Sequence, residues 1–294
     1  MQYAYLTRSI VWIVQGHTPS IDEVRSYWEQ NPLLSHELGE LPPGEHWKHL
    51  DLMKRTDIEA FSEKYWGFDE SQGKSILDIG CGPGWLTVTY ASAGAAVTAV
   101  DLTQTAVDIT KSVLASKSLK ADVKVANAEQ LPFGDCSFDI VVSSGVLHHT
   151  PDTNRCFAEA FRVTNHGGIG RITLYRLGPL HRPFIFPVVR AIMRLTRTAH
   201  PGANLATTAS SVEDFIRQYD GAENPLGIAR SDSDWQTALE AAGWRVISSE
   251  THYFPARMVP LLRKVPRSIH RLLDKYLGTM VYFTLLKPNP ARAN

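Results

Sequence analysis

The sequence predicts an α/β fold with a central, mostly parallel sheet and helices on both faces. Between residues 74 and 175, short apolar runs alternate with segments of helical periodicity, which is the pattern of consecutive βαβ units. A glycine-rich turn follows the first run, and an acidic residue ends the second. Right-handed crossovers place the carboxyl ends of parallel strands at one edge, so ligand-binding residues are expected in the loops after the strands.

Five strands and three helices are expected in this central segment. The strands are Ser75–Ile79, Ala96–Asp101, Asp122–Val125, 138–143 and 169–174, and the helices are 86–93, 105–117 and Thr153–Val163. Each strand follows from a short apolar run, and each helix from apolar residues that recur at intervals of three and four.

The rest of the chain predicts three segments around this core. Residues 1–73 are expected to form a helical cap, with helices at Ile21–Gln30 and 51–66 and a proline-rich turn at 31–44. Residues 176–230 hold several prolines and glycines and predict a lid insertion, after the core at 74–175. Residues 231–294 then complete a seven-stranded sheet, with a helix at 234–242 and strands at Arg245–His252 and 281–286.

The composition is that of an ordinary globular protein. Hydrophobic residues make up 44% of the 294 and charged residues 20%. No run of 18 apolar residues exists and the start lacks a signal-peptide cleavage site, so we expect no stable membrane insertion and a cytoplasmic location. Cys81, Cys136 and Cys156 are odd in number and not closely paired, so they predict free thiols and no metal site.

The charge is balanced in total but unevenly distributed. Residues 1–175 hold 14 Lys and Arg against 21 Asp and Glu, whereas residues 176–294 hold 16 against 9. Either an anionic partner of the second part or attraction between core and cap accounts for this asymmetry.

Two basic stretches in the second part each have two interpretations. Residues 176–212 hold five arginines and no acidic residue. Four of the arginines either bind a carboxylate or phosphate or form a solvated face: Arg182, Arg190, Arg194 and Arg197. The last three recur at helical spacing, which favours the solvated face. Residues 257–275 form a basic amphipathic stretch that either contacts an anionic membrane or packs on the core, the commoner arrangement.

The first strand runs into a turn with the sequence Asp78-Ile-Gly80-Cys81-Gly82-Pro-Gly84. Glycines there permit a tight backbone and close approach of a ligand. A dinucleotide fingerprint requires a third glycine at position 85, which is tryptophan, so a pyrophosphate-binding turn is disfavoured. The negative charge of Asp78 favours a cationic ligand instead.

The next two strand ends suit a nucleoside. Asp101 ends the second strand, where a carboxylate can accept hydrogen bonds from both ribose hydroxyls. The third strand leads into residues 127–133, from which a polar side chain and a backbone N–H can contact an adenine edge. Leu102 and Leu131 are placed to sandwich the ring.

With these motifs, residues 74–174 resemble class I S-adenosylmethionine-dependent methyltransferases, in particular the small-molecule branch of the methyltransferase-11 type. The resemblance implies a Rossmann-like methyltransferase fold, S-adenosylmethionine as the donor and S-adenosylhomocysteine as the product. It assigns the methionine part to Asp78, Gly80, Cys81, Gly82 and Gly84, the ribose to Asp101 beside Leu102, the adenine to Asn127 and Ala128 beside Glu129, and the transferred methyl to the loop 143–149 that includes Ser144. The family often has aspartate where this chain has Asn127, whose amide oxygen still accepts a hydrogen bond.

The acceptor side is expected after the fourth strand. Methyl transfer is an in-line displacement, so holding the acceptor against the methyl group suffices and a base is optional. His149, and with less preference His148, can take a proton from the acceptor or can simply orient the loop. Tyr27, Tyr175 and Arg176 are candidate substrate contacts, whereas Trp28 fits core packing better.

Three functions remain open at this point. The first is methyl transfer to a small-molecule acceptor through O, N, S or C. The second is a nucleic-acid or protein methyltransferase; the amino-methylating enzymes of nucleic acids resemble one another in an Asn/Asp-Pro-Pro-aromatic motif, absent from 143–149 here, and the neutral net charge disfavours broad phosphate binding. The third is a protein that binds S-adenosylmethionine without transferring its methyl group, because fold and cofactor do not fix the reaction. The oligomeric state is not readable from the sequence.

Overall fold

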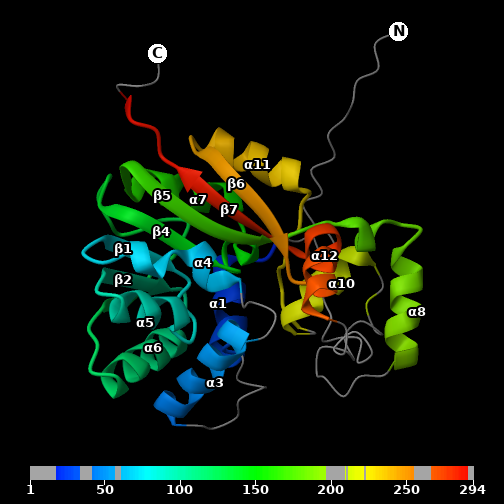
Figure 1. Cartoon of the computed structure of the whole chain (residues 1–294), viewed down its shortest axis with the longest axis horizontal. Helices are drawn as coiled ribbons and strands as arrows, with labels where there is room; N and C mark the ends of the chain where they lie inside the picture. Colours follow the sequence, from blue (N-terminus) through cyan, green and yellow to red (C-terminus); the bar gives the residue numbers. More distant parts are fainter. Residues whose placement is uncertain are drawn as a thin grey trace.

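The molecule is built on one seven-stranded sheet in the order β3-β2-β1-β4-β5-β7-β6 (Figure 1). The computed structural model describes residues 18–33, 42–56, 61–196, 209, 211–221, 223–254 and 266–290. The strands are β1 (Ser75–Ile79), β2 (Ala96–Asp101), β3 (Asp122–Val125), β4 (Phe138–Ser144), β5 (Thr164–Tyr175), β6 (Arg245–His252) and β7 (Met280–Leu286). Strands β1 to β5 pair in parallel, while β7 pairs antiparallel with both β5 and β6. The predicted mostly parallel sheet is therefore confirmed.

Helices cover both faces of this sheet. They are α1 (Ile21–Gln30), α3 (Pro43–Thr56), α4 (Ser62–Trp66), α5 (Trp85–Ser92), α6 (Gln104–Ser116), α7 (Thr153–Val163), α8 (Phe186–Thr196), α10 (Val212–Arg217), α11 (Asp232–Ala241) and α12 (Arg267–Leu277), with 3₁₀ helices η1 (Phe68–Glu70), η2 (Leu147–His149), η3 (Pro179–His181) and η4 (Gln218–Asp220). Every helix that the structure describes is too short or too polar to traverse a lipid bilayer.

The alternation of side chains along the strands separates two cores. On one face Leu77, Val141 and Ile172 pack with Phe157 of α7 and Trp235 of α11. On the other face a second cluster joins the sheet to α3, α4 and α5; its buried members include Leu50, Trp66, Ile76, Trp85, Tyr90, Val97 and Val142. Parallel strands buried on both faces read as continuous apolar runs, which is why the sequence revealed them.

Strand positions match the sequence expectation closely, apart from β5. Strands β1, β2, β3 and β6 have the predicted bounds, and β4 and β7 are each one residue longer. The prediction was wrong for β5, which begins at Thr164 rather than at residue 169. Two glycines lie in this early part, and the β4–β5 register shifts between Phe138 and Ile140, so the segment resembles a turn in sequence while still pairing.

The helix predictions succeed where caps are clear. Helix α1 has the predicted bounds because Ser20 and Glu23 form a capping box. The helix expected at 51–66 was wrong: α3 spans Pro43–Thr56 and α4 spans Ser62–Trp66, and residues 57–60 lie outside the described part. Proline suits the first turn of a helix, so α3 begins where a turn was expected. Helices α5, α6 and α11 begin one or two residues before the predicted positions.

The segment after β5 forms a lobe at one end of the sheet. Figure 1 shows α8, α10 and α12 gathered there, opposite α5 and α6. Tyr175, Phe186, Phe215 and Ile216 share a small apolar cluster of this lobe. Of the four arginines expected on a solvated face, Arg182 is exposed and Arg190 is half-buried with its guanidinium 5.8 Å from the Phe186 ring, while Arg197 and the Arg194 side chain lie outside the described residues.

Candidate cofactor and acceptor site

The glycine-rich turn after β1 is shaped by three left-handed glycines. Gly80, Gly82 and Gly84 have φ values of +78°, +49° and +84°. A Cβ on Gly80 would lie 2.4 Å from Val146 and one on Gly84 would lie 2.8 Å from Thr110, whereas one on Gly82 would meet nothing within 4 Å. Gly80 and Gly84 are thus fixed by packing, and the backbone at Gly82 faces open space that a ligand can approach.

Asp78 brings a buried carboxyl group beneath this turn. It is 1% exposed, and its Oδ2 accepts a hydrogen bond of 2.6 Å from Thr87 Oγ1. Its Oδ1 is buried and has no hydrogen-bond partner among the described residues. Burial, together with the charge of Asp101, raises the pKa of Asp78 to about 7. An unpartnered carboxylate oxygen beside an open glycine fits a cationic ligand group.

Asp101 connects the turn to the second strand. Its Oδ2 accepts a 3.0 Å hydrogen bond from the Gly82 backbone N–H, and its Oδ1 accepts bonds of 3.0 and 2.8 Å from Thr103 N and Oγ1. Burial raises the pKa of Asp101, although these hydrogen bonds favour its ionised form. The sequence placed Asp101 and the glycines in one site, and the structure brings them into direct contact.

The loop after β3 carries the residues that the sequence predicted to contact adenine. The Asn127 side-chain oxygen accepts a 2.9 Å hydrogen bond from the Glu129 backbone N–H. The Glu129 carboxylate turns away and accepts a 2.8 Å bond from Asp152 N, so it ties this loop to the start of α7. Ala128 and Leu131 are buried in the core, with Leu102 packed against the same cluster.

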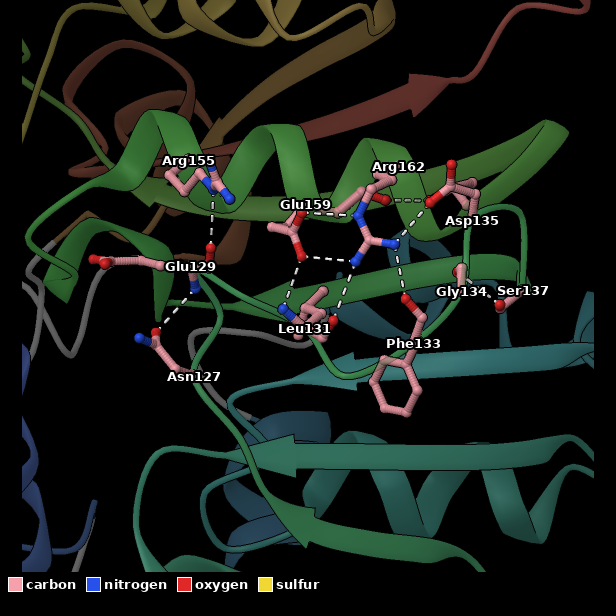
Figure 2. Close-up of polar contacts among 12 residues, drawn as sticks. Asn127, Glu129, Leu131, Phe133, Gly134, Asp135, Ser137, Arg155, Glu159 and Arg162 are labelled. Carbon is pink, nitrogen blue, oxygen red and sulfur yellow. Dashed lines mark hydrogen bonds and ion pairs between the residues drawn. The ribbon is translucent and has the colours of Figure 1, made fainter.

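Arg162 of α7 holds the same loop through its guanidinium, as Figure 2 shows. Its guanidinium donates to Glu159, to Asp135 and to the carbonyl oxygens of Leu131 and Phe133, at 2.7 to 3.1 Å. Glu159 in turn accepts a 2.8 Å bond from Leu131 N. The sequence analysis missed this brace, although an arginine three residues after a glutamate on a helix is a recognisable pairing pattern.

The two histidines of η2 are both buried but differ in their partners. His149 Nδ1 lies 2.6 Å from the carbonyl oxygen of Leu226, which can only accept, so Nδ1 carries a proton. His149 Nε2 lies 3.2 Å from Asp220 Oδ2, an ion-pair distance without hydrogen-bond alignment. Neither ring nitrogen of His148 has a hydrogen-bond partner in the described part, and burial lowers its pKa well below 6.5.

Asp220 of η4 collects the acceptor-side residues. Its backbone oxygen accepts a 2.6 Å bond from the Tyr27 hydroxyl, and its Oδ2 accepts a bond from the Tyr175 hydroxyl. The rings of His148 and Tyr175 lie 4.0 Å apart, and Trp28 meets His149 edge-on at 5.2 Å. The structure therefore brings Tyr27, Tyr175 and both histidines together around a residue that the sequence analysis did not single out. Asp220 is a lone aspartate in a segment without a recognisable motif, so no pattern in the sequence indicated its position.

Arg176 and Ser144 lie nearby with different surroundings. Arg176 Nε lies 2.8 and 2.9 Å from the two carboxylate oxygens of Asp232, and its NH1 group donates to Gly278 O at 3.1 Å. These partners belong to α11 and to the turn before β7. The Arg176 guanidinium is therefore engaged in hydrogen bonds within the protein. Ser144 is half-buried at the end of β4, before the left-handed Gly145.

Helix α1 spans the donor and acceptor sides through three consecutive residues. Glu29 accepts bonds of 3.0 Å from Gln104 N and from Thr105 N, so it caps the start of α6. The preceding Tyr27 and Trp28 reach Asp220 and His149. The helix is thereby fixed across the carboxyl edge of the sheet.

Comparison with known proteins finds a methyltransferase domain in the central segment. Residues 77–172, about a third of the chain, match the methyltransferase domain family. A malonyl-[acyl-carrier protein] O-methyltransferase of Erwinia billingiae is 32% identical over 47% of this chain and 56% of its own length. A ubiquinone biosynthesis O-methyltransferase of Aromatoleum aromaticum is 37% identical over 33% of this chain and 42% of its own length. The chain thus spans about half the length of the curated relatives it matches.

Solved structures share the fold at low identity. The [4+2]-cyclase SpnF is similar with a TM-score of 0.55 and 17% identity, covering 92% of this chain and 97% of its own. An S-adenosylmethionine-dependent methyltransferase of Methanosarcina mazei gives a TM-score of 0.52 with 20% identity, covering 74% of this chain and 93% of its own. The chain thus contains a segment that matches a methyltransferase domain, within a seven-stranded fold that these solved structures share.

Proposed function

We propose that this protein transfers a methyl group from S-adenosylmethionine to a small-molecule acceptor. The observation that carries the proposal is the buried, unpartnered Oδ1 of Asp78 at the end of the strand that leads into the turn with the open backbone of Gly82. A ligand with an ammonium or sulfonium group would compensate this carboxylate, and Asp101 and Asn127 lie where ribose and adenine would be bound. S-adenosylmethionine supplies a methyl group on a positively charged sulfur, which a nucleophile attacks in line.

The acceptor would be bound between α1 and the lobe after β5. Tyr27, Tyr175 and His148 lie near Asp220 at the carboxyl edge, and they offer hydroxyl and imidazole groups to a polar acceptor. In this proposal residues 1–73 act as the cap, 74–175 as the donor-binding core, 176–230 as the lid and 231–294 as the completion of the sheet. Arg176 contributes by holding the strand end in place rather than by binding substrate.

His149 is the proposed proton acceptor where the acceptor atom carries a proton. Its Nδ1–H is held by Leu226 O, which leaves Nε2 to take the proton, and the carboxylate of Asp220 would stabilise the imidazolium that forms. His148, whose pKa is far below 6.5, stays neutral and would orient the acceptor through hydrogen bonds. The curated relatives named above are O-methyltransferases, which favours an oxygen acceptor.

Two alternatives carry less support. A nucleic-acid acceptor is disfavoured because the chain has no net charge and lacks the expected motif after β4. A non-methylating role is compatible with the fold, since one structural neighbour is named a [4+2]-cyclase. We also propose a cytoplasmic location.

Calorimetry with S-adenosylmethionine and S-adenosylhomocysteine tests the donor site. Asp101→Ala should abolish measurable binding, whereas Asp122→Ala, an exposed carboxylate at the sheet edge, should leave it unchanged. Incubation of the wild type with methyl-labelled donor and a metabolite extract then tests transfer. Label in a small product supports the proposal. Donor binding without any transfer favours the non-methylating alternative, and no donor binding refutes the assignment.

A further inference from the structure

Exposed apolar side chains gather on two helices of the lobe after β5. Eleven large apolar side chains are exposed among the described residues, and seven of them belong to this lobe. They are Phe184, Ile185, Val188 and Ile192 at α8, and Ile269, Leu272 and Tyr276 at α12. Single exposed apolar residues are ordinary, but such a concentration marks an interaction surface.

Helix α8 has an apolar outer face in its described part. Phe186 points inward, is 6% exposed and meets the Phe215 ring at 5.3 Å. Helix α8 has one charged side chain within residues 186–192, that of Arg190, which is half-buried against Phe186. The exposed positions are Pro187, Val188, Ala191 and Ile192. A helix in water normally presents polar residues outward, whereas residues 186–192 of α8 are apolar on the outer face as well as at Phe186 and Val189, which pack inward.

Helix α12 buries only one edge of its apolar stripe. Leu273 and Leu277 are half-buried on the side that packs against β6, while Leu272 and Tyr276 remain 56% and 57% exposed. Ile269 extends the exposed edge by one turn and is 46% exposed. The core packing that the sequence favours for this stretch therefore accounts for only part of the helix.

The charges beside these apolar residues are basic. Arg271 and Lys275 lie exposed next to the apolar edge of α12, and Arg182 is exposed just before α8. The single acidic residue of α12, Asp274, turns inward, where it accepts a 2.7 Å bond from Phe254 N. No carboxylate thus offsets the positive charge on the outer face of either helix within the described residues.

We propose that α8 and α12 dock this protein onto an anionic lipid surface. Amphipathic helices with an apolar edge and flanking Lys or Arg bind at the headgroup boundary of a bilayer without spanning it. A second copy of the chain is a poorer occupant, because a twofold contact through α12 would set Arg271 and Lys275 against their own copies. The proposal is independent of the methyl-transfer reaction.

Vesicle flotation with the full-length protein tests this docking. Binding is expected to vesicles of phosphatidylcholine with phosphatidylglycerol and to be weak on pure phosphatidylcholine, with a loss of about fivefold for each of Arg271→Gln and Lys275→Gln. Leu272→Glu and Phe184→Glu should each reduce binding at least as strongly. Leu52→Glu, on α3 and 58% exposed, is the matched control that should bind like the wild type.

The outcomes separate this proposal from the proposed function. Calorimetry with S-adenosylmethionine on the same variants should give unchanged affinity, which also shows that they are folded. Equal binding to neutral and anionic vesicles, or no binding to either, would overturn the docking proposal. A reversible dimer that Leu272→Glu dissociates, in place of vesicle binding, would assign the surface to a second copy and overturn it as well.

Discussion

His149 Nε2 lies 3.2 Å from Asp220 Oδ2, and this pair joins the core of the protein to the proposed lid. His149 belongs to η2 after β4, whereas Asp220 ends η4, some 70 residues later in the chain. The Tyr175 hydroxyl donates to the same carboxylate oxygen. One carboxylate therefore connects the end of β4, the end of β5 and the lid.

The first prediction concerns Asp220. Asp220→Ala removes an acceptor for Tyr175 and the charged partner of His149, so it should lower the free energy of unfolding by about 1–3 kcal/mol. It should also lower kcat with the acceptor, while donor affinity stays close to that of the wild type. Urea denaturation and calorimetry measure the two effects. A variant with wild-type stability and wild-type kcat would show that this carboxylate has no role; Asp122→Ala is the exposed control.

Asp220 also shows where prediction from the sequence stops. The donor half was predictable because strands buried on both faces and a glycine turn leave strong local patterns at Asp78, Gly82 and Asp101. The position of Asp220 depends on how a segment without regular periodicity folds back over the sheet. That is set by tertiary contacts such as Leu226 O with His149, which leave no trace in spacing.

Helix α8 illustrates a second limit. The helical spacing of its arginines predicted a solvated charged face, yet Arg190 leans on Phe186 and the exposed positions are apolar. Periodicity identifies the two faces of a helix but assigns the apolar one to the protein interior by default. Only the structure reveals that the described part of this helix is apolar on its outer face as well as on the face that carries Phe186.

The second prediction concerns the cap that α1 places on α6. Glu29→Ala removes acceptors for Gln104 N and Thr105 N and should cost about 1 kcal/mol of stability. Hydrogen bonds from Thr105 hold the pKa of Glu29 below its usual value. The stabilisation is therefore present above pH 4.5 and lost as pH falls through the lower folded-state pKa. Thermal unfolding at neutral and acidic pH checks this, with Glu23 left intact so that the capping box of α1 is kept; an unchanged melting temperature at neutral pH would contradict it.

The third prediction concerns Glu159 and Arg162, whose hydrogen bonds hold the loop after β3. Glu159→Ala leaves the Leu131 backbone N–H without its acceptor and removes two hydrogen bonds of the Arg162 guanidinium, so stability should fall by about 2–3 kcal/mol. Because this loop carries Asn127, donor affinity should fall as well. Calorimetry and urea denaturation measure both, with Glu240→Ala on α11 as the exposed control. Unchanged donor affinity in a destabilised variant would show that the brace does not position Asn127.

The fourth prediction separates two roles for Arg176. Its bonds to Asp232 and Gly278 predict that Arg176→Gln lowers stability by about 1–2 kcal/mol while KM for the acceptor stays unchanged. The exposed Arg182→Gln serves as the control for loss of a positive charge near the lid. A rise in KM at wild-type stability would instead make Arg176 a substrate contact.

The last prediction follows from the raised pKa of Asp78. In the folded protein this pKa is about 7, against an ordinary value of 3.8, so the ionised fraction rises from about one tenth at pH 6 to about nine tenths at pH 8. A cationic donor prefers the carboxylate, and its affinity should therefore increase about tenfold over this range, with release of a proton on binding. Calorimetry in two buffers with different ionisation enthalpies measures both quantities.

The Asp78→Asn variant provides the control for this pH dependence. It should bind the donor more weakly and with little change between pH 6 and pH 8. Without ligand, the folded wild type holds the Asp78 proton more tightly than the unfolded chain does, so its stability falls as pH rises from about 4 to about 7. The asparagine variant should lack that part of the decline. A donor affinity that is flat with pH in the wild type would show that Asp78 is ionised before the donor binds, and would remove it as the group that couples binding to proton release.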